Sequence, residues 1–288
     1  MIVQWLLAAA LLFGMGMTPA QVGPTASITR DMVYAEHDGF DPQDTSLDIY
    51  AAPDASNAPV IVFVHGGGWS LGDKTSVYLK PDHFIPMGYV FVSVNYRLVP
   101  DIAFPDNAQD VADAIAWVQA NIATYGGDGG QIYLMGHSAG AHLISLVATD
   151  GQYLQAAGTD LPALSGVIAL DSAAYNVVTR GESRRGLGPL YENAFGTDET
   201  VWAQASPALH VAPDKGIPPF LLVYTGATDA HGVETTAFAQ ALEDAGVRAE
   251  VVSATDHTHA SLNRQLGAEG DAPTAAVDAF LASLHAAG

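Results

Sequence analysis

The stretch QIYLMGHSAG, residues 131–140, places a serine in a tight turn between an apolar strand and an apolar helix. Residues 131–135 have the apolar composition of a buried strand, and helical spacing of apolar residues follows the turn. Such a turn forces Ser138 into a strained backbone conformation with little room around it, which explains Gly136 and Gly140. The turn would expose the Ser138 hydroxyl at a helix N-terminus, so the context predicts a nucleophile.

Strands and helices alternate along the rest of the chain. Apolar–polar alternation predicts a strand at residues 45–50, and apolar runs predict strands at residues 59–64, 89–94, 131–135, 166–170, 220–224 and 249–252. Helical spacing predicts helices at residues 106–122, 141–148, 235–245 and 272–286. Because parallel strands joined through helices form a sheet covered on both faces, the pattern predicts an α/β fold with a mostly parallel sheet. Residues 45–50 alternate apolar and polar side chains, so this strand is expected at an edge.

The length of 288 residues suits one large α/β domain, which we expect over residues 21–288. Residues 176–215 interrupt the alternation with several glycines, Pro189 and aromatic side chains. A connection of this length is typical of a functional insertion, so we expect a small cap that helps to shape a substrate pocket.

A second glycine-rich turn is HGGGW, residues 65–69, which directly follows a predicted buried strand. Residues without side chains let backbone N–H groups approach a substrate oxygen closely. We expect the N–H groups of Gly67, Gly68 and Ala139 to stabilise the oxyanion of a tetrahedral intermediate, each by roughly 3 to 4 kcal/mol. Trp69 ends this turn, where its ring would either line the pocket or pack on the sheet.

A serine nucleophile needs a histidine to take its proton and a carboxylate to orient that histidine, in the chain order serine, acid, histidine. Asp229 follows the predicted strand at residues 220–224, where parallel sheets place functional groups, and it is the preferred acid. Asp171 ends the preceding predicted strand and is a second candidate. Asp256 is a third, although it lies very close in sequence to the candidate histidines.

Two histidines, His257 and His259, lie in the loop after the last predicted strand. One of them would act as the base, and His259 is preferred because the helical stretch that follows would fix its backbone. His137, inside the serine turn, is expected to line the substrate pocket. The spacing of the histidines indicates no metal site, and we expect no cofactor.

The chain carries 31 Asp and Glu residues against 10 Lys and Arg, for a formal net charge of -21. Such a surface repels polyanions, so nucleic acid is not an expected partner. The acidity is typical of a highly soluble protein, and steering of a cationic substrate is the alternative interpretation. The chain has no cysteine, which excludes disulfides, thiolate catalysis and thiolate metal sites.

Residues 1–20 have features of a secretory signal peptide. An apolar run from Trp5 to Met17 precedes small residues that suit cleavage after Ala20, although the segment before the run lacks the usual lysine or arginine. The run is shorter than the roughly 20 apolar residues that a membrane-spanning helix requires. We therefore expect a secreted or periplasmic protein without stable membrane association after cleavage.

These motifs together resemble those of the HGGG-type esterases of the α/β-hydrolase superfamily. The resemblance rests on HGGGWSLGDK at 65–74, NYRL at 95–98, YGGD at 125–128, GHSAGAH at 136–142 and HASLNR at 259–264. It implies an α/β-hydrolase fold with Ser138 as nucleophile, Asp229 as acid, His259 as base and Gly67, Gly68 and Ala139 as oxyanion donors. Asn95 stands where many hormone-sensitive-lipase-like members carry Asp, which favours similarity to the bacterial feruloyl-esterase or arylformamidase-like groups.

The motifs and the resemblance predict a serine carboxylesterase that hydrolyses short-chain or aryl esters through an acyl-serine intermediate. An arylformamidase or amidase that cleaves a C–N bond with the same triad is the first alternative. A non-catalytic binding module is the second, since fold alone does not dictate function. The expected partner is a small-molecule ester, and the residues indicate nothing about oligomeric state.

Overall fold

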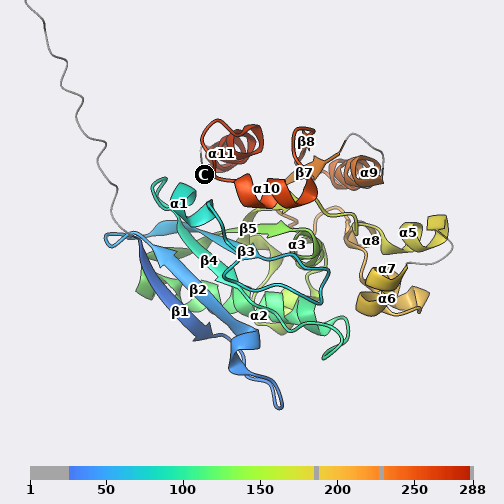
Figure 1. The fold of residues 1–288 in the computed structure, drawn as a ribbon, viewed down its shortest axis with the longest axis horizontal. Coiled ribbons are helices and arrows are strands. Elements are labelled where there is room, and N and C mark those ends of the chain that lie inside the picture. The colour runs from blue at the N-terminus through green and yellow to red at the C-terminus, as the bar shows by residue number, and fades with distance from the viewer. Residues whose placement is uncertain (1–25, 185–187, 227–229, 286–288) are drawn as a thin grey trace, which may run out of the picture.

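The computed structural model describes residues 26–184, 188–226 and 230–285 (Figure 1). Within these residues, eight strands form one sheet in the order β1-β2-β4-β3-β5-β6-β7-β8. The strands are β1 Ser27–Val33, β2 Ser46–Ala51, β3 Ala58–Val64, β4 Val90–Val94, β5 Gly127–His137, β6 Leu164–Leu170, β7 Phe220–Thr225 and β8 Ala249–Ala254. β2 pairs antiparallel with β1 and β4, and the other neighbouring pairs are parallel. The predicted mostly parallel α/β sheet is confirmed, while the predicted leader at residues 1–20 lies outside the described residues.

The helices either cover the sheet or form an insertion between β6 and β7. The covering helices are α1 Lys80–Phe84, α2 Asp106–Asn121, α3 Ala139–Thr149, α4 Gln152–Ala156, α9 Ala230–Asp244, α10 His259–Gln265 and α11 Ala272–His285, with 3-10 turns at Pro42–Thr45, Ile122–Tyr125 and Leu161–Ala163. The insertion contains α5 Val177–Arg184, α6 Pro189–Phe195, α7 Glu199–Gln204 and α8 Pro207–His210, in the segment for which a cap was predicted. Among the described helices, none is both long and apolar enough to cross a membrane.

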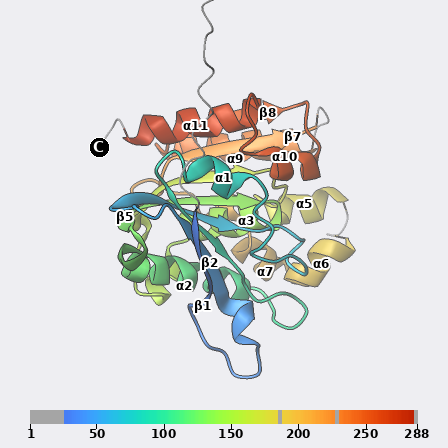
Figure 2. The same ribbon diagram turned by 60° about the vertical axis from the view of Figure 1, so that its left-hand side comes forward.

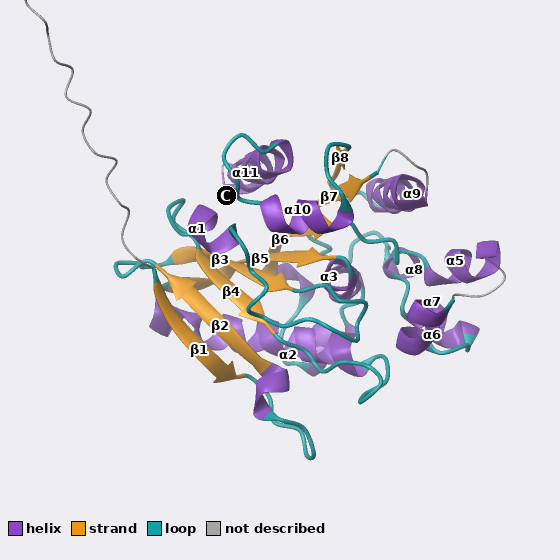
Figure 3. Cartoon of the chain, viewed as in Figure 1, coloured by secondary structure: helices purple, strands orange, loops and turns teal. Residues whose placement is uncertain are grey.

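Helices cover both faces of the sheet (Figure 3), and an apolar core lies on each face. One contains side chains of α2, α3 and α9, and the other contains side chains of α1, α10 and α11. β3 contributes to both, because successive side chains of a strand point to opposite faces. Val60, Val62 and Val64 belong to the first core, and Ile61 and Phe63 belong to the second. This burial on both faces explains why the strand is continuously apolar in sequence.

The prediction that residues 45–50 form an edge strand is wrong. β1 pairs with β2 and forms the edge, and all six residues of β2 are buried. Asp48 of β2 is buried, and two cations compensate its charge. The carboxylate accepts a hydrogen bond from Arg30 at 3.1 Å and lies 3.0 Å from the Lys74 ammonium. The sequence of β1, SITRDMV, is too polar to show the alternation by which an edge strand is predicted.

The segments that follow β3, β5, β6 and β8 meet at one edge of the sheet, because parallel strands end on the same side. The glycine-rich turn follows β3, and the serine turn follows β5. Asp171 follows β6, and the loop after β8 leads into α10. Helix α6 of the insertion lies at this edge (Figure 2), where it shares a pocket with the serine turn and α10.

Candidate active site

Ser138 stands in the turn between β5 and α3 with φ 57° and ψ -119°, a backbone conformation that L-residues rarely adopt. Its N–H donates to the Leu170 carbonyl oxygen at 2.9 Å, which ties the turn to β6. A Cβ at Gly136 would meet the Gly140 backbone at 2.6 Å, and one at Gly140 would meet the Val64 carbonyl oxygen at 2.1 Å. Close packing of the turn therefore requires both glycines.

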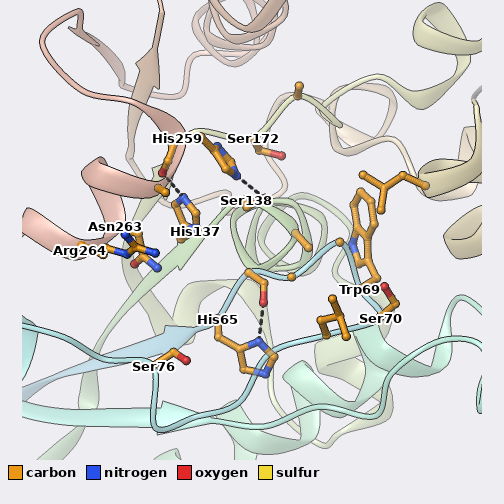
Figure 4. A pocket seen from close by; sticks show the side chains of 18 of the residues that line it. His65, Trp69, Ser70, Ser76, His137, Ser138, Ser172, His259, Asn263 and Arg264 are labelled. Atoms are coloured by element: carbon orange, nitrogen blue, oxygen red, sulfur yellow. Dashed lines mark hydrogen bonds between the residues drawn. The ribbon is translucent and has the colours of Figure 1, made fainter.

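His259 links Ser138 to a buried carboxylate. Its Nε2 lies 2.9 Å from the Ser138 hydroxyl oxygen (Figure 4), and its Nδ1 lies 2.7 Å from Oδ2 of Asp171. An ionised carboxylate only accepts hydrogen bonds, so Nδ1 donates to Asp171 and Nε2 accepts from Ser138. The side chain of Thr258 caps α10 by accepting from the Ser261 N–H, which fixes the backbone at His259.

The Asp171 side chain is surrounded by hydrogen-bond donors at the end of β6. Its Oδ1 accepts from the Thr225 N–H at 2.8 Å and lies 3.1 Å from Nδ1 of His231, while Oδ2 accepts from the Thr225 hydroxyl. Burial by itself raises the pKa of this carboxyl, since Asp171 is only 1% exposed. The hydrogen bonds from His231, His259 and Thr225 outweigh burial and hold the pKa well below its usual range. Asp171 is therefore ionised at neutral pH.

In the structure the carboxylate that contacts Nδ1 of His259 is that of Asp171, whereas the sequence favoured Asp229 as the acid. Asp229 lies outside the described residues. Chain order does not separate the two, because both follow a strand and both lie between Ser138 and His259. The pairing of β5 with β6, which brings Asp171 beside the serine turn, is a property of the folded sheet. Asp256, the third candidate, is exposed in the turn before α10, and no hydrogen bond joins it to His259 in the described structure.

His257, the alternative base, is engaged elsewhere. Its Nε2 lies 2.8 Å from Oδ1 of Asp271, and its Nδ1 lies 3.4 Å from the Ser261 hydroxyl oxygen. Both ring nitrogens of His257 thus have partners away from Ser138, and His259 is the histidine that the structure brings to the serine.

Backbone N–H groups without acceptors lie beside Ser138. Gly67, Gly68 and Ala139 line the same pocket as the serine. Gly67 and Gly68 have φ values of 130° and 60°, and within the described structure neither N–H donates a hydrogen bond. Ala139 is the first residue of α3, where an N–H has no acceptor inside the helix. Donors placed in this way suit an oxyanion that forms on a carbonyl bound to Ser138.

The ring of His65 holds the glycine-rich turn in shape. It stacks on Tyr96 with 4.5 Å between ring centroids, and its Nδ1 donates to the Gly66 carbonyl oxygen at 2.8 Å (Figure 4). The Tyr96 hydroxyl donates to the His65 carbonyl oxygen at 3.1 Å. Burial lowers the pKa of His65, so the ring adds no positive charge to the turn.

A pocket of about 480 Å³ beside Ser138 is bounded by the glycine-rich turn, α6 and α10. Trp69 and His137, the two predicted pocket residues, both line it. The Trp69 indole also packs inward: its N–H donates to Nδ1 of His142 at 3.2 Å, and its ring meets Phe195 edge-on at 4.8 Å. The structure thus shows Trp69 lining the pocket, as one interpretation of the sequence predicted, while the inward contacts of its ring are with His142 of α3 and with Tyr191 and Phe195 of α6.

His137 contacts the backbone of the base. Its Nε2 donates to the His259 carbonyl oxygen at 2.9 Å, and the two rings lie 4.5 Å apart between centroids. Burial, assisted by the neighbouring His259, lowers the pKa of His137 to about 3. A neutral His137 can hold His259 without placing a second positive charge beside it.

A buried lysine on α1 holds the helix that carries His259. Nζ of Lys80 donates to the backbone oxygen and to Oδ1 of Asn263, each at 2.7 Å. Asn263 lies about one helical turn after His259 in α10. Burial lowers the pKa of Lys80 to about 7, yet a neutral amine still has a hydrogen for each of the two Asn263 oxygens. Sequence analysis did not identify Lys80, because the contact joins residues 183 positions apart.

Replacing Lys80 by methionine is expected to lower kcat by about tenfold with little change in KM, because α10 would hold His259 less firmly. The two Asn263 oxygens would lose their donor, which costs about 1 to 3 kcal/mol of unfolding free energy for each acceptor left buried. Steady-state kinetics and urea unfolding measure the two effects. Wild-type values for both would show that the contact is dispensable.

His231 in α9 shares Asp171 with His259. The hydrogen bond to Asp171 raises the pKa of His231, and burial opposes this. The resulting stabilisation is complete below the unfolded pKa of about 6.5 and is lost as pH rises through the raised folded pKa. We expect His231→Gln to lower Tm by roughly 1 to 3 °C at about pH 5.5, and by much less at about pH 9. Thermal unfolding at both pH values measures this, and equal losses would contradict it.

The family model described as BD-FAE matches residues 47–235 of the chain, a span that includes Ser138 and Asp171. Esterase LipQ of Mycobacterium tuberculosis is 31% identical over 242 residues, covering 77% of this chain and 54% of that protein. The probable isoprenylcysteine alpha-carbonyl methylesterase ICMEL2 of Arabidopsis thaliana is 30% identical over 253 residues, covering 83% of this chain and 58% of that protein. The chain thus spans little more than half the length of these curated relatives.

Solved esterase structures have the same fold. An esterase of Thermogutta terrifontis, Est2 with butyrate bound, gives a TM-score of 0.70 at 24% identity and covers 91% of this chain and 95% of that chain. Esterase B from Lactobacillus rhamnosis gives a TM-score of 0.71 at 20% identity, and the match covers 91% of this chain and 86% of that chain. At these identities the likeness shows the fold, and the α/β-hydrolase fold expected from the sequence is confirmed.

Proposed function

We propose, from the premise that this chain belongs to the BD-FAE family, that it hydrolyses carboxylic esters through an acyl intermediate on Ser138. The observation that carries the proposal is the hydrogen-bonded series from Asp171 through His259 to Ser138. A serine hydroxyl alone is a poor nucleophile, and this series supplies the base and its orientation. The names of the relatives, an esterase and a probable methylesterase, support an ester as the substrate.

Hydrolysis in this site takes two steps. The Ser138 oxygen attacks the ester carbonyl carbon while its proton moves to Nε2 of His259, and the N–H groups of Gly67, Gly68 and Ala139 stabilise the oxyanion. The intermediate then expels the alcohol, which takes the proton from His259 and leaves the acyl group on Ser138. Water loses a proton to His259 and attacks the acyl carbonyl carbon, and the bond to the Ser138 oxygen then breaks. His259 returns the proton to that oxygen, which releases the carboxylic acid and restores the serine hydroxyl.

We assign the acid of the triad to Asp171. Its carboxylate accepts from Nδ1 of His259, and this fixes the tautomer in which Nε2 is free to take the proton. The negative charge also stabilises the imidazolium that forms after proton transfer. Asp171 performs both tasks while it stays ionised.

The pocket suits short-chain or aryl esters. Its volume of about 480 Å³ is in the range of sites that enclose a small molecule. The side chains of Trp69, Leu190 and Tyr191 contribute an apolar and aromatic part of the lining. Such a wall packs well against a short acyl chain or a flat ring.

Hydrolysis of 4-nitrophenyl esters of increasing acyl length, with methyl ferulate and N-formylkynurenine alongside, tests the proposed function. We expect the highest kcat/KM for acetate or butyrate, and little turnover of the formamide. Faster turnover of N-formylkynurenine would favour the amidase alternative, and ligand binding without hydrolysis of any ester would favour the binding module. Faster turnover of an emulsified long-chain triglyceride would contradict the preference for short chains.

We also propose that the protein is exported and that its leader is cleaved after Ala20. The apolar run at residues 5–17 and the small residues before the cleavage bond support this. The mature chain is expected to begin at Gln21, which intact-mass measurement of protein recovered from the periplasm or medium of the producing cells can detect. Protein retained in the cytoplasm with residues 1–20 in place would contradict export.

A further inference from the structure

Arg264 on α10 is a cation without a partner in the described structure. The other Lys and Arg side chains that the structure describes each donate to a carboxylate or to an uncharged oxygen. No hydrogen bond or ion pair joins Arg264 to any described residue. In a chain with 31 acidic residues and 10 basic ones, a guanidinium left without a carboxylate is conspicuous. Arg264 is exposed, so its guanidinium is solvated and open to an anionic ligand.

The free guanidinium belongs to the catalytic pocket. Arg264 lines the pocket that contains Ser138, and the walls that the structure describes include no Asp or Glu. Figure 4 shows Arg264 and Asn263 on the opposite side of Ser138 from Trp69. A cationic wall and an aromatic wall therefore flank the nucleophile, and they would take chemically different parts of one substrate.

The position of Arg264 relative to His259 indicates which part of an ester it would contact. The leaving alcohol takes its proton from Nε2 of His259, so the alcohol portion must lie next to that histidine. Arg264 follows His259 by five residues on the same helix, a separation of about 7.5 Å along the axis. An alcohol portion about as long as a substituted phenyl ring would therefore extend from His259 toward Arg264.

Further donors lie on the same wall. Nζ of Lys80 donates to Oδ1 of Asn263, which turns the Nδ2 group of that amide away from Lys80. The side chains of Ser76 and Tyr78 line the pocket as well. A carboxylate has lone pairs for several donors and pairs with a guanidinium through two parallel hydrogen bonds.

We propose that Arg264 binds a carboxylate on the alcohol portion of the ester substrate, so that the preferred substrates are anionic esters. This inference rests on the proposed ester hydrolysis at Ser138. The long-range field of a chain with net charge -21 disfavours anions. Arg264 would therefore act locally, by selecting anionic esters once they reach the pocket.

A matched pair of esters tests the proposal: 4-acetoxybenzoate and the neutral 4-acetoxybenzamide, which are nearly equal in size. The ratio of their kcat/KM values is measured in wild type, Arg264→Gln, Arg264→Lys and Arg248→Gln. Arg248 lies on the exposed part of the surface beside Glu250, so its variant removes the same charge outside the pocket. Comparing ratios across variants cancels the intrinsic reactivity of the two esters.

We expect the ratio to fall by about threefold to tenfold in Arg264→Gln, mainly through KM of the anionic ester, as for one partly exposed ionic contact. Arg264→Lys should keep part of the preference, and Arg248→Gln should keep the wild-type ratio. Hydrolysis of the neutral ester should stay close to wild type in Arg248→Gln, and any change in its kcat/KM in the two Arg264 variants is divided out of the ratio.

An unchanged ratio in Arg264→Gln would overturn the proposal and leave Arg264 the role of a cation in the last turn of α10, where it would affect stability alone. A second pair, phenyl 4-carboxybenzoate and phenyl 4-carbamoylbenzoate, carries the charge on the acyl portion. A loss of preference confined to this pair would overturn the assignment to the alcohol side. If wild type hydrolysed none of the four esters, the proposed function itself would fail, and this inference would fail with it.

Discussion

Replacing Ser138 by alanine is expected to lower kcat for 4-nitrophenyl acetate by about a millionfold, to the residual rate that binding and oxyanion stabilisation provide. The variant keeps His259 and Asp171, but no oxygen remains at 2.9 Å from Nε2 to attack the ester. The substitution removes one oxygen at the N-cap of α3, a buried helix of 11 residues. It should therefore leave the fold intact, which circular dichroism can verify.

Ser172→Ala is the matched control for this loss. Ser172 lines the same pocket and is as deeply buried as its neighbour Asp171, but its hydroxyl lies outside the series from Asp171 to Ser138. We expect the control to retain activity within about tenfold of wild type, as for a pocket residue without a covalent role. Undiminished ester turnover in Ser138→Ala would contradict the proposal that Ser138 is the nucleophile.

Replacing Asp171 by asparagine is expected to lower kcat by about ten-thousandfold. The amide would keep the side-chain shape, but its NH₂ group can donate to Nδ1 of His259 and favour the tautomer in which Nε2 cannot accept from Ser138. The variant also loses the charge that stabilises the imidazolium. Steady-state kinetics of the purified variant, with an unfolding curve to confirm that it is folded, measure this effect.

Asp229→Asn is the decisive comparison, because the sequence favoured Asp229. Asp171 occupies the hydrogen bond at Nδ1 of His259, so the Asp229 variant should keep kcat within about tenfold of wild type. The reverse result, a large loss in Asp229→Asn and a small loss in Asp171→Asn, would return the role of the acid to Asp229.

The sequence predicted the main features of the fold and of the site wherever the chemistry is local. The turn at Ser138 needs small residues on both sides, and a strand and a helix must flank it, so a short stretch specifies it. The glycine-rich turn at residues 65–69 is specified in the same way. The helix after His259 distinguished it from His257, because a capped helix fixes the residue at its start.

The features that the sequence did not predict depend on which strands are neighbours. Asp171 and Asp229 are equivalent by chain order, and the placement of Asp171 follows from the pairing of β6 with β5. The interior position of β2 follows from β1, whose polar sequence carries little strand pattern. Asp48 in β2 is polar yet buried, since Arg30 and Lys74 neutralise it from other segments.

The contact of Lys80 with α10 and the proposed role of Arg264 could not be predicted from the sequence either. Both belong to short helices whose sequences are compatible with simple solvent-facing cations. Lys80 is buried because α1 packs against the end of α10, and Arg264 lines the pocket because the same helix begins at His259. Tertiary contacts of this kind leave no local pattern in a single sequence.

Titration with a fluorophosphonate tests the central claim most directly, because this reagent reacts with an activated serine and stays attached. The account predicts that esterase activity falls in proportion to the label bound, that full inactivation takes about one label per chain, and that the label is on the peptide containing Ser138. Asp171→Asn should slow the labelling, and Ser138→Ala should abolish it. A label on another residue, or full activity in a completely labelled protein, would contradict the account.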